Sequence, residues 1–221
     1  MDTLFMIAVL AVIAFIVIRI SRKNRAKQRS HLIDSYEFPS RIRDKVASTY
    51  PHLDDQQVDL VMDGLRDYFH VCNVAGTRMV SMPSQAVDVA WHEFILFTKH
   101  YQQFCSKALG RFLHHTPAEA MSSPTMAQTG IKNAWRITCT REQIDPKTPD
   151  RLPLLFAMDA ALAIPDGFTY ALNCKTSDYR PGSYPYCASH IGCGSGCSSG
   201  GEGSDIGGDG DSGCGGGCGG D

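Results

Sequence analysis

The residues of this chain that could do chemistry gather between positions 88 and 117, in the stretch DVAWHEFILFTKHYQQFCSKALGRFLHHTP. If this stretch is helical, Asp88 and His92 are four residues apart and lie on the same face. A carboxylate at that spacing can accept an imidazole N–H and fix the tautomer of the ring. Carboxylates, imidazoles and thiolates are also the ligands that zinc and iron use in proteins. We therefore consider four residues as candidate metal ligands or catalytic groups: Asp88, His92, Cys105 and His115.

The spacing matches no familiar metal motif, because His92 is followed by Glu93 and has no second histidine four positions later. A structural interpretation therefore stays open, in which Asp88 and His92 form a surface pair and His115 stabilises a loop. Cys105 lies at the edge of the apolar helix face, where a cysteine is more often an inert core residue than a nucleophile. On the same helical wheel Glu93 and His100 fall in the apolar half, so we expect both to be buried and Glu93 to need a partner.

Helix signals on both sides of this stretch predict a mainly helical domain. Ser84 is a helix start, and apolar periodicity up to Gly110 predicts one long helix. Capping boxes predict helix starts at Asp54 and Thr116. Further helices are predicted at residues 40–50, 54–76, 124–142 and 154–163, and FTYAL (168–172) predicts a short strand.

The N-terminus carries an uncharged apolar run from Thr3 to Ile18. Extended to residues 2–20, a helix of this run rises about 28 Å, close to the ~30 Å of a bilayer core. Six basic residues follow the run: Arg19, Arg22, Lys23, Arg25, Lys27 and Arg29. A secretory signal would have its charge before the run, so the order predicts a single-pass anchor in the cell (inner) membrane. The positive-inside rule predicts an outside N-terminus and a cytoplasmic main domain.

The C-terminal end is rich in glycine and cysteine. It has few apolar side chains and is predicted to be disordered. It carries two Cys-x-x-x-Cys pairs, a spacing that zinc sites permit, and these four thiols are weaker metal or redox candidates: Cys193, Cys197, Cys214 and Cys218. The odd cysteine total of nine and the absence of a secretory pattern favour a reducing compartment. The net charge of −2 gives no broad basic excess, so no nucleic-acid partner is expected.

The central stretch resembles the glycine-rich domain-containing protein family over about residues 50–180. The matching residues are Asp88, Trp91, His92, Tyr101, Cys105, Gly110, Phe112, His114, His115 and Pro117. The glycine-rich tail is similar to that of the family's bacterial members. The resemblance implies no established activity, but it favours His92 and His115 over Glu93 and His100 as site residues. Plant relatives tend to have a second histidine shortly after the Trp-His pair, where this chain has Glu93 and Phe94.

These patterns divide the chain into a transmembrane helix (3–20), a basic juxtamembrane linker (21–35), a helical domain (36–186) and a disordered tail (187–221). The first functional hypothesis is a membrane-tethered cytoplasmic binding or scaffold module with an unidentified protein partner. The second is a metal-dependent enzyme, with zinc or iron, or a thiol enzyme, centred on the four candidate residues. Convergence of their side chains on one cleft would favour the second hypothesis.

Overall fold

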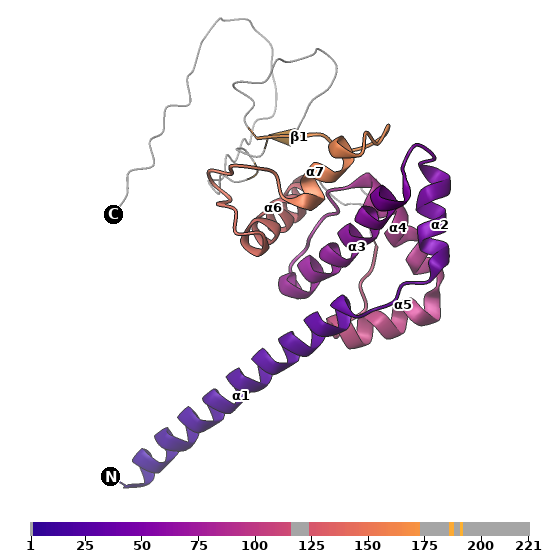
Figure 1. The fold of residues 1–221 in the computed structure, drawn as a ribbon. Helices are drawn as coiled ribbons and strands as arrows, with labels where there is room; N and C mark the ends of the chain where they lie inside the picture. The colour runs from indigo at the N-terminus through magenta and orange to yellow at the C-terminus, as the bar shows by residue number, and fades with distance from the viewer. Residues whose placement is uncertain (1, 116–123, 173–185, 188–190, 192–221) are drawn as a thin grey trace, which may run out of the picture.

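The computed structural model describes residues 2–115, 124–172, 186–187 and 191 of the chain, and most of them are helical, as predicted (Figure 1). The helices are α1 (Asp2–Asp34), α2 (Ser40–Thr49), α3 (Asp55–Ala75), α4 (Gln85–Leu96), α5 (Thr98–Phe104), the π-helical segment η1 (Cys105–Leu109), α6 (Pro124–Arg141) and α7 (Leu154–Ala161). Two short strands, β1 (Tyr170–Ala171) and β2 (Tyr186–Cys187), pair in parallel with Tyr170 opposite Tyr186. The strand expected at residues 168–172 is therefore present, although shorter.

Helix α1 projects from the rest of the molecule as a single rod (Figure 1). Its stretch from Phe5 onward is long and apolar enough to cross a membrane, and the large apolar side chains from Phe5 to Ile20 are exposed. The helix has the length and composition of a membrane anchor or of a signal sequence. The basic segment 21–35 is mostly the second half of this helix, and Ile33 within it is fully buried in the core. The packed domain thus begins a few residues before the predicted boundary at residue 36.

Helix α3 is the centre of the fold and contacts α1, α2, α4, η1, α6 and α7. The predicted capping box is confirmed: the Asp54 carboxylate accepts from the backbone N–H of Gln57, and the Gln57 side chain accepts from that of Asp54. Gly76, at φ +62°, follows the last helical residue as predicted. The apolar face of α3 is buried, with Phe69 packed against Phe104 at a ring separation of 4.7 Å.

The single long helix predicted from Ser84 to Gly110 is wrong. Helix α4 ends at Leu96, Phe97 has a non-helical ψ of 56°, and α5 and η1 follow as separate segments. The break changes the helical phase, so His100 is exposed rather than buried as the wheel predicted. Glu93 is nearly buried, with a side chain 11% exposed, and lies 3.5 Å from Arg41, so the expectation of a partner is confirmed.

The crossing of α3 with α4 and α7 depends on the absence of a side chain at Gly64. A Cβ there would lie 2.6 Å from Met158 Cε and 2.9 Å from Val87 Cγ2. We predict that Gly64→Val lowers the free energy of unfolding by about 1–3 kcal/mol, because overpacking displaces these neighbours. Urea denaturation of the full chain in detergent measures the effect, with the exposed neighbour Asp63→Ala as the control. Equal stability of the two variants would contradict this packing.

Candidate metal centre

Three of the four candidate residues meet in space. Asp88 Oδ1 lies 3.2 Å from His115 Nε2, and Asp88 Oδ2 lies 3.4 Å from His92 Nδ1. The two rings approach each other through their other nitrogens, His92 Nε2 and His115 Nδ1, also at 3.4 Å. One ligand atom from each residue can be chosen so that all three lie within 4.8 Å of one another. We call these residues the Asp-His-His cluster.

The hydrogen bonds of the cluster run from His92 through His115 to Asp88. His115 Nε2 donates to the Asp88 carboxylate at 3.2 Å, and His92 Nδ1 lies within ion-pair distance of the same carboxylate at 3.4 Å. The other two nitrogens, His92 Nε2 and His115 Nδ1, are hydrogen-bonded at 3.4 Å, and an N–H on either can donate to the lone pair of the other. A metal ion would replace the contact between the two rings, with Asp88 orienting the two ligands or turning to become the third. All three residues are needed in either arrangement.

One ligand atom from each residue lies within 4.8 Å of the others, so the side chains would have to close in slightly around a zinc ion. Zinc–nitrogen bonds of about 2.1 Å place neighbouring tetrahedral ligand atoms about 3.4 Å apart. The Asp88 and His115 side chains are only 17% and 15% exposed, whereas that of His92 is 52% exposed. The cluster is therefore sheltered on one side and open to water on the other, so solvent or a small ligand can complete the coordination of an ion.

His115 is held in place by a chain of buried aromatic groups. Trp91 Nε1 donates to the Tyr101 hydroxyl at 3.1 Å, and this hydroxyl donates to the Leu113 carbonyl at 2.5 Å. The Trp91 ring meets the His115 ring edge-on, with centroids 4.6 Å apart. The sequence analysis named Trp91 and Tyr101 only among the residues that carry the family resemblance. Because the Trp91 indole and Tyr101 fix the segment before His115, both residues also position the cluster.

Helix α4 is held at its start by a residue that the sequence analysis missed. The carboxylate of Asp159 on α7 is buried, with the residue 2% exposed. It accepts hydrogen bonds from Ser84 Oγ (2.6 Å) and from the backbone N–H groups of Gln85 (2.7 Å), Ala86 (3.3 Å) and Phe168 (2.9 Å). Ser84 caps α4 as predicted, and Asp159 fixes this cap and with it the first turn that carries Asp88. A lone carboxylate in the apolar segment LLFAMDAALA was the only sequence signal for this role.

A cavity of about 210 Å³ lies beside the cluster and shares His115 with it. Trp91, Tyr68 and Leu113 give it apolar walls, and Arg111 brings a positive charge to its lining. Within residues 2–115 and the other described ranges, Arg111 forms no hydrogen bond or ion pair. The cavity therefore has room and charge for a small anionic group next to His115.

Cys105 does not join the cluster. Cys105 is fully buried, and its thiol interacts with the Tyr101 hydroxyl and with the backbone at Leu113. Burial raises the pKa of the Cys105 thiol, which disfavours the thiolate needed for metal binding or nucleophilic attack. Cys105, which the sequence suggested as a fourth ligand, is therefore a structural cysteine of the core.

We predict that Cys105 and Cys72 resist alkylation in the folded chain. Burial raises the pKa of Cys72 to about 12 from 9.0, which reduces its thiolate fraction at pH 8 by roughly a thousandfold. Reaction should become faster as the pH rises, because the thiolate fraction increases. Peptide mapping after iodoacetamide treatment, with and without urea, measures both sites. Cys105 modified as fast in the folded chain as in the unfolded one would show an accessible nucleophile and contradict its structural role.

His114, the neighbour of His115, is not part of the cluster. His114 is exposed and its ring contacts that of Phe112. The Thr116 capping box and the tail thiols Cys193, Cys197, Cys214 and Cys218 lie outside the described residues, as does the tail predicted to be disordered.

The fold and the site define a helical domain that follows a long apolar helix and carries an Asp-His-His cluster at its surface. The chain belongs to the UCP032817-like family, whose model matches residues 28–191 and so includes all three residues of the cluster. Comparison with curated proteins and with solved structures finds no match. The family match gives no information about an activity. It also gives none about a relation to glycine-rich domain-containing proteins, so that relation stays a prediction.

Proposed function

We propose that this chain is a membrane-tethered domain that binds one divalent transition metal ion, zinc or iron, through Asp88, His92 and His115. The observation that carries the proposal is the convergence of the three side chains, with two imidazole nitrogens facing each other at 3.4 Å. Two histidines and one carboxylate are a ligand set used by both catalytic zinc and non-haem iron centres.

The surroundings of the cluster favour a reactive or ligand-exchanging metal over a structural one. Structural zinc sites have four protein ligands, whereas at most three converge here among the described residues. The exposed side of His92 admits water, and the cavity beside His115 admits a small ligand that Arg111 would attract if it is anionic. These features support a metal-dependent enzyme, the second of the two functions predicted from the sequence. The thiol-enzyme form of that prediction has no support from the buried Cys105.

The features of α1 support the membrane attachment. Its large apolar side chains from Phe5 to Ile20 are exposed, and its basic residues come after the apolar run. The positive-inside rule then places the N-terminus outside and the domain in the cytoplasm, at the inner membrane. Resistance of the full chain to extraction by alkaline carbonate tests the anchor. Release of the intact chain into the soluble fraction would argue against it.

The metal is tested by elemental analysis of the full chain, purified in detergent with the four tail cysteines replaced by serine. We expect close to one zinc or iron per chain, lost in Asp88→Ala and retained in the control His100→Ala, which removes an exposed histidine outside the cluster. Absence of metal from a folded chain, after incubation with each ion as well, would contradict the proposal. The cluster would then be a hydrogen-bonded part of a scaffold, and the search would move to a protein partner.

A further inference from the structure

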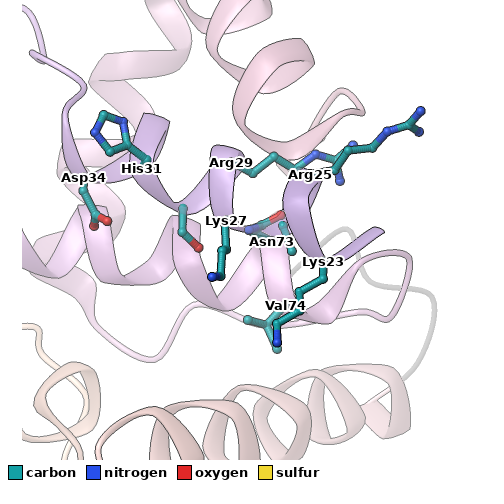
Figure 2. Close-up of a pocket in the computed structure, with 10 residues that line it drawn as sticks. Lys23, Arg25, Lys27, Arg29, His31, Asp34, Asn73 and Val74 are labelled. Atoms are coloured by element: carbon teal, nitrogen blue, oxygen red, sulfur yellow. The ribbon is translucent and has the colours of Figure 1, made fainter. Parts of the chain in front are cut away.

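A second cavity lies where α1 meets the rest of the molecule. It is a cleft of about 800 Å³ between the basic half of α1 and the end of α3. Figure 2 shows the side chains of α1 along this cleft, with Lys23 and Lys27 on the side of Asn73 and Val74 of α3. The cleft is separate from the Asp-His-His cluster, since the two share no lining residue.

The cleft carries a strong excess of positive charge. Four of its lining residues are basic, namely Lys23, Arg25, Lys27 and Arg29, and His31 lies at its edge. Its one carboxylate, that of Asp34, is 2.6 Å from His70 Nε2 and so is already engaged. Within the part of the chain that the structure describes, none of the four basic side chains forms an ion pair or a hydrogen bond. Lys23 and Lys27 are the two that lie on the side of α3, and two unpaired cations in one cleft favour an anionic ligand.

The position of the cleft along α1 indicates which anion it meets. The exposed apolar side chains of α1 end at Ile20, and Lys23 and Lys27 follow at about 5 and 10 Å further along the helix. If the apolar run fills the hydrocarbon core, Lys23 lies at the depth of the phospholipid headgroups, whose layer is about 5–8 Å thick, and the long side chain of Lys27 can reach back to that layer. Val74 is 53% exposed at the same cleft and Ala26 also lines it, so apolar surface adjoins the basic groups.

We infer that this cleft binds the headgroup of an anionic phospholipid, with its phosphate between Lys23 and Lys27. The site rests on the proposed membrane attachment but not on the metal. Bound lipid would join α1 to α3 and thereby fix the domain relative to the membrane. The guanidinium of Arg29 lies on the other side of α1, close to Gly110, which directly follows η1. Helix α1 is therefore already packed against η1 at this level.

The test is a titration of the delipidated full chain, in a neutral detergent, with short-chain phosphatidylglycerol. Isothermal titration calorimetry measures the binding. Short-chain phosphatidylcholine and inorganic phosphate are titrated in parallel. We expect saturable binding of phosphatidylglycerol alone, weakened roughly tenfold or more in Lys23→Gln/Lys27→Gln, because each lysine near an anionic lipid contributes to binding. The matched control is Lys132→Gln/Arg136→Gln, which removes two positive charges at the same spacing on α6.

Three results would overturn the inference. Equal binding of phosphatidylcholine would show that charge is not recognised, and equal binding of inorganic phosphate would identify a site for small anions instead. Equal weakening of phosphatidylglycerol binding in the Lys132→Gln/Arg136→Gln control would show that only the net charge of the chain matters. The metal content of the Lys23→Gln/Lys27→Gln variant is expected to match that of the unmodified chain, and the titration needs neither bound metal nor an intact bilayer. Failure of the lipid site is therefore distinguishable from failure of the metal site or of membrane insertion.

Discussion

Replacement of Asp159 by alanine is expected to lower the free energy of unfolding by about 3–5 kcal/mol, the largest stability effect we predict for a single substitution. The carboxylate is buried and accepts four hydrogen bonds, three of them from Ser84, Gln85 and Ala86 at the start of α4. Its removal leaves the Ser84 hydroxyl and the backbone N–H of Ala86 buried without this acceptor and takes a negative charge from the positive end of the helix.

Chemical denaturation of the full chain measures this loss, with Asp150→Ala as the control because Asp150 is exposed. Asp159→Asn keeps the shape of the side chain but substitutes an amide N–H₂ for one acceptor oxygen, so an intermediate loss is expected. The first turn of α4 carries Asp88, and for this reason Asp159→Ala should also weaken metal binding. Stability equal to that of Asp150→Ala would mean that α4 does not depend on this contact.

Replacement of His115 by alanine is expected to weaken metal binding by at least about 100-fold, a loss typical of removing a metal-binding side chain from a small site. The substitution takes away the nitrogen that faces His92 Nε2 and one of the two groups that hold the Asp88 carboxylate. Competition with a chromophoric chelator measures the zinc affinity. Because the imidazoles must lose protons to bind a metal, the affinity of the unmodified chain should also rise with pH.

The matched control for this variant is His114→Ala, which removes the adjacent exposed histidine without touching the cluster. It should retain the full affinity and the pH dependence. Comparable losses in His114→Ala and His115→Ala would indicate that the segment binds metal without a defined site, and the Asp-His-His cluster would lose its role.

Local sequence patterns predicted the local structure well. The capping box at Asp54 and the cap at Ser84 depend on residues within one helical turn, and both are present. The proximity of Asp88 and His92 is likewise fixed by their spacing on α4. The sequence analysis favoured His115 because it lies in the stretch that resembles the glycine-rich domain-containing protein family. The fold brings His115 next to both Asp88 and His92.

Non-local contacts account for what the sequence did not predict. The hydrogen-bond partners of Asp159 in α4 lie 73–75 residues away, so no spacing rule connects them. The helix break at Phe97 is marked by neither glycine nor proline. Because the apolar pattern continues across it, the sequence did not indicate the change of helical phase that exposes His100. Cys105 was ambiguous because a helical wheel does not distinguish the edge of a face from the interior.

The most direct test of the metal centre is a crystal structure of the zinc-loaded chain with anomalous diffraction recorded at the zinc absorption edge. The proposed site predicts one strong anomalous peak at about 2.1 Å from a nitrogen of His92 and from a nitrogen of His115, beside the Asp88 carboxylate. A peak bound elsewhere, or no peak at these side chains while the domain retains its fold, would contradict the assignment of this cluster as a metal site.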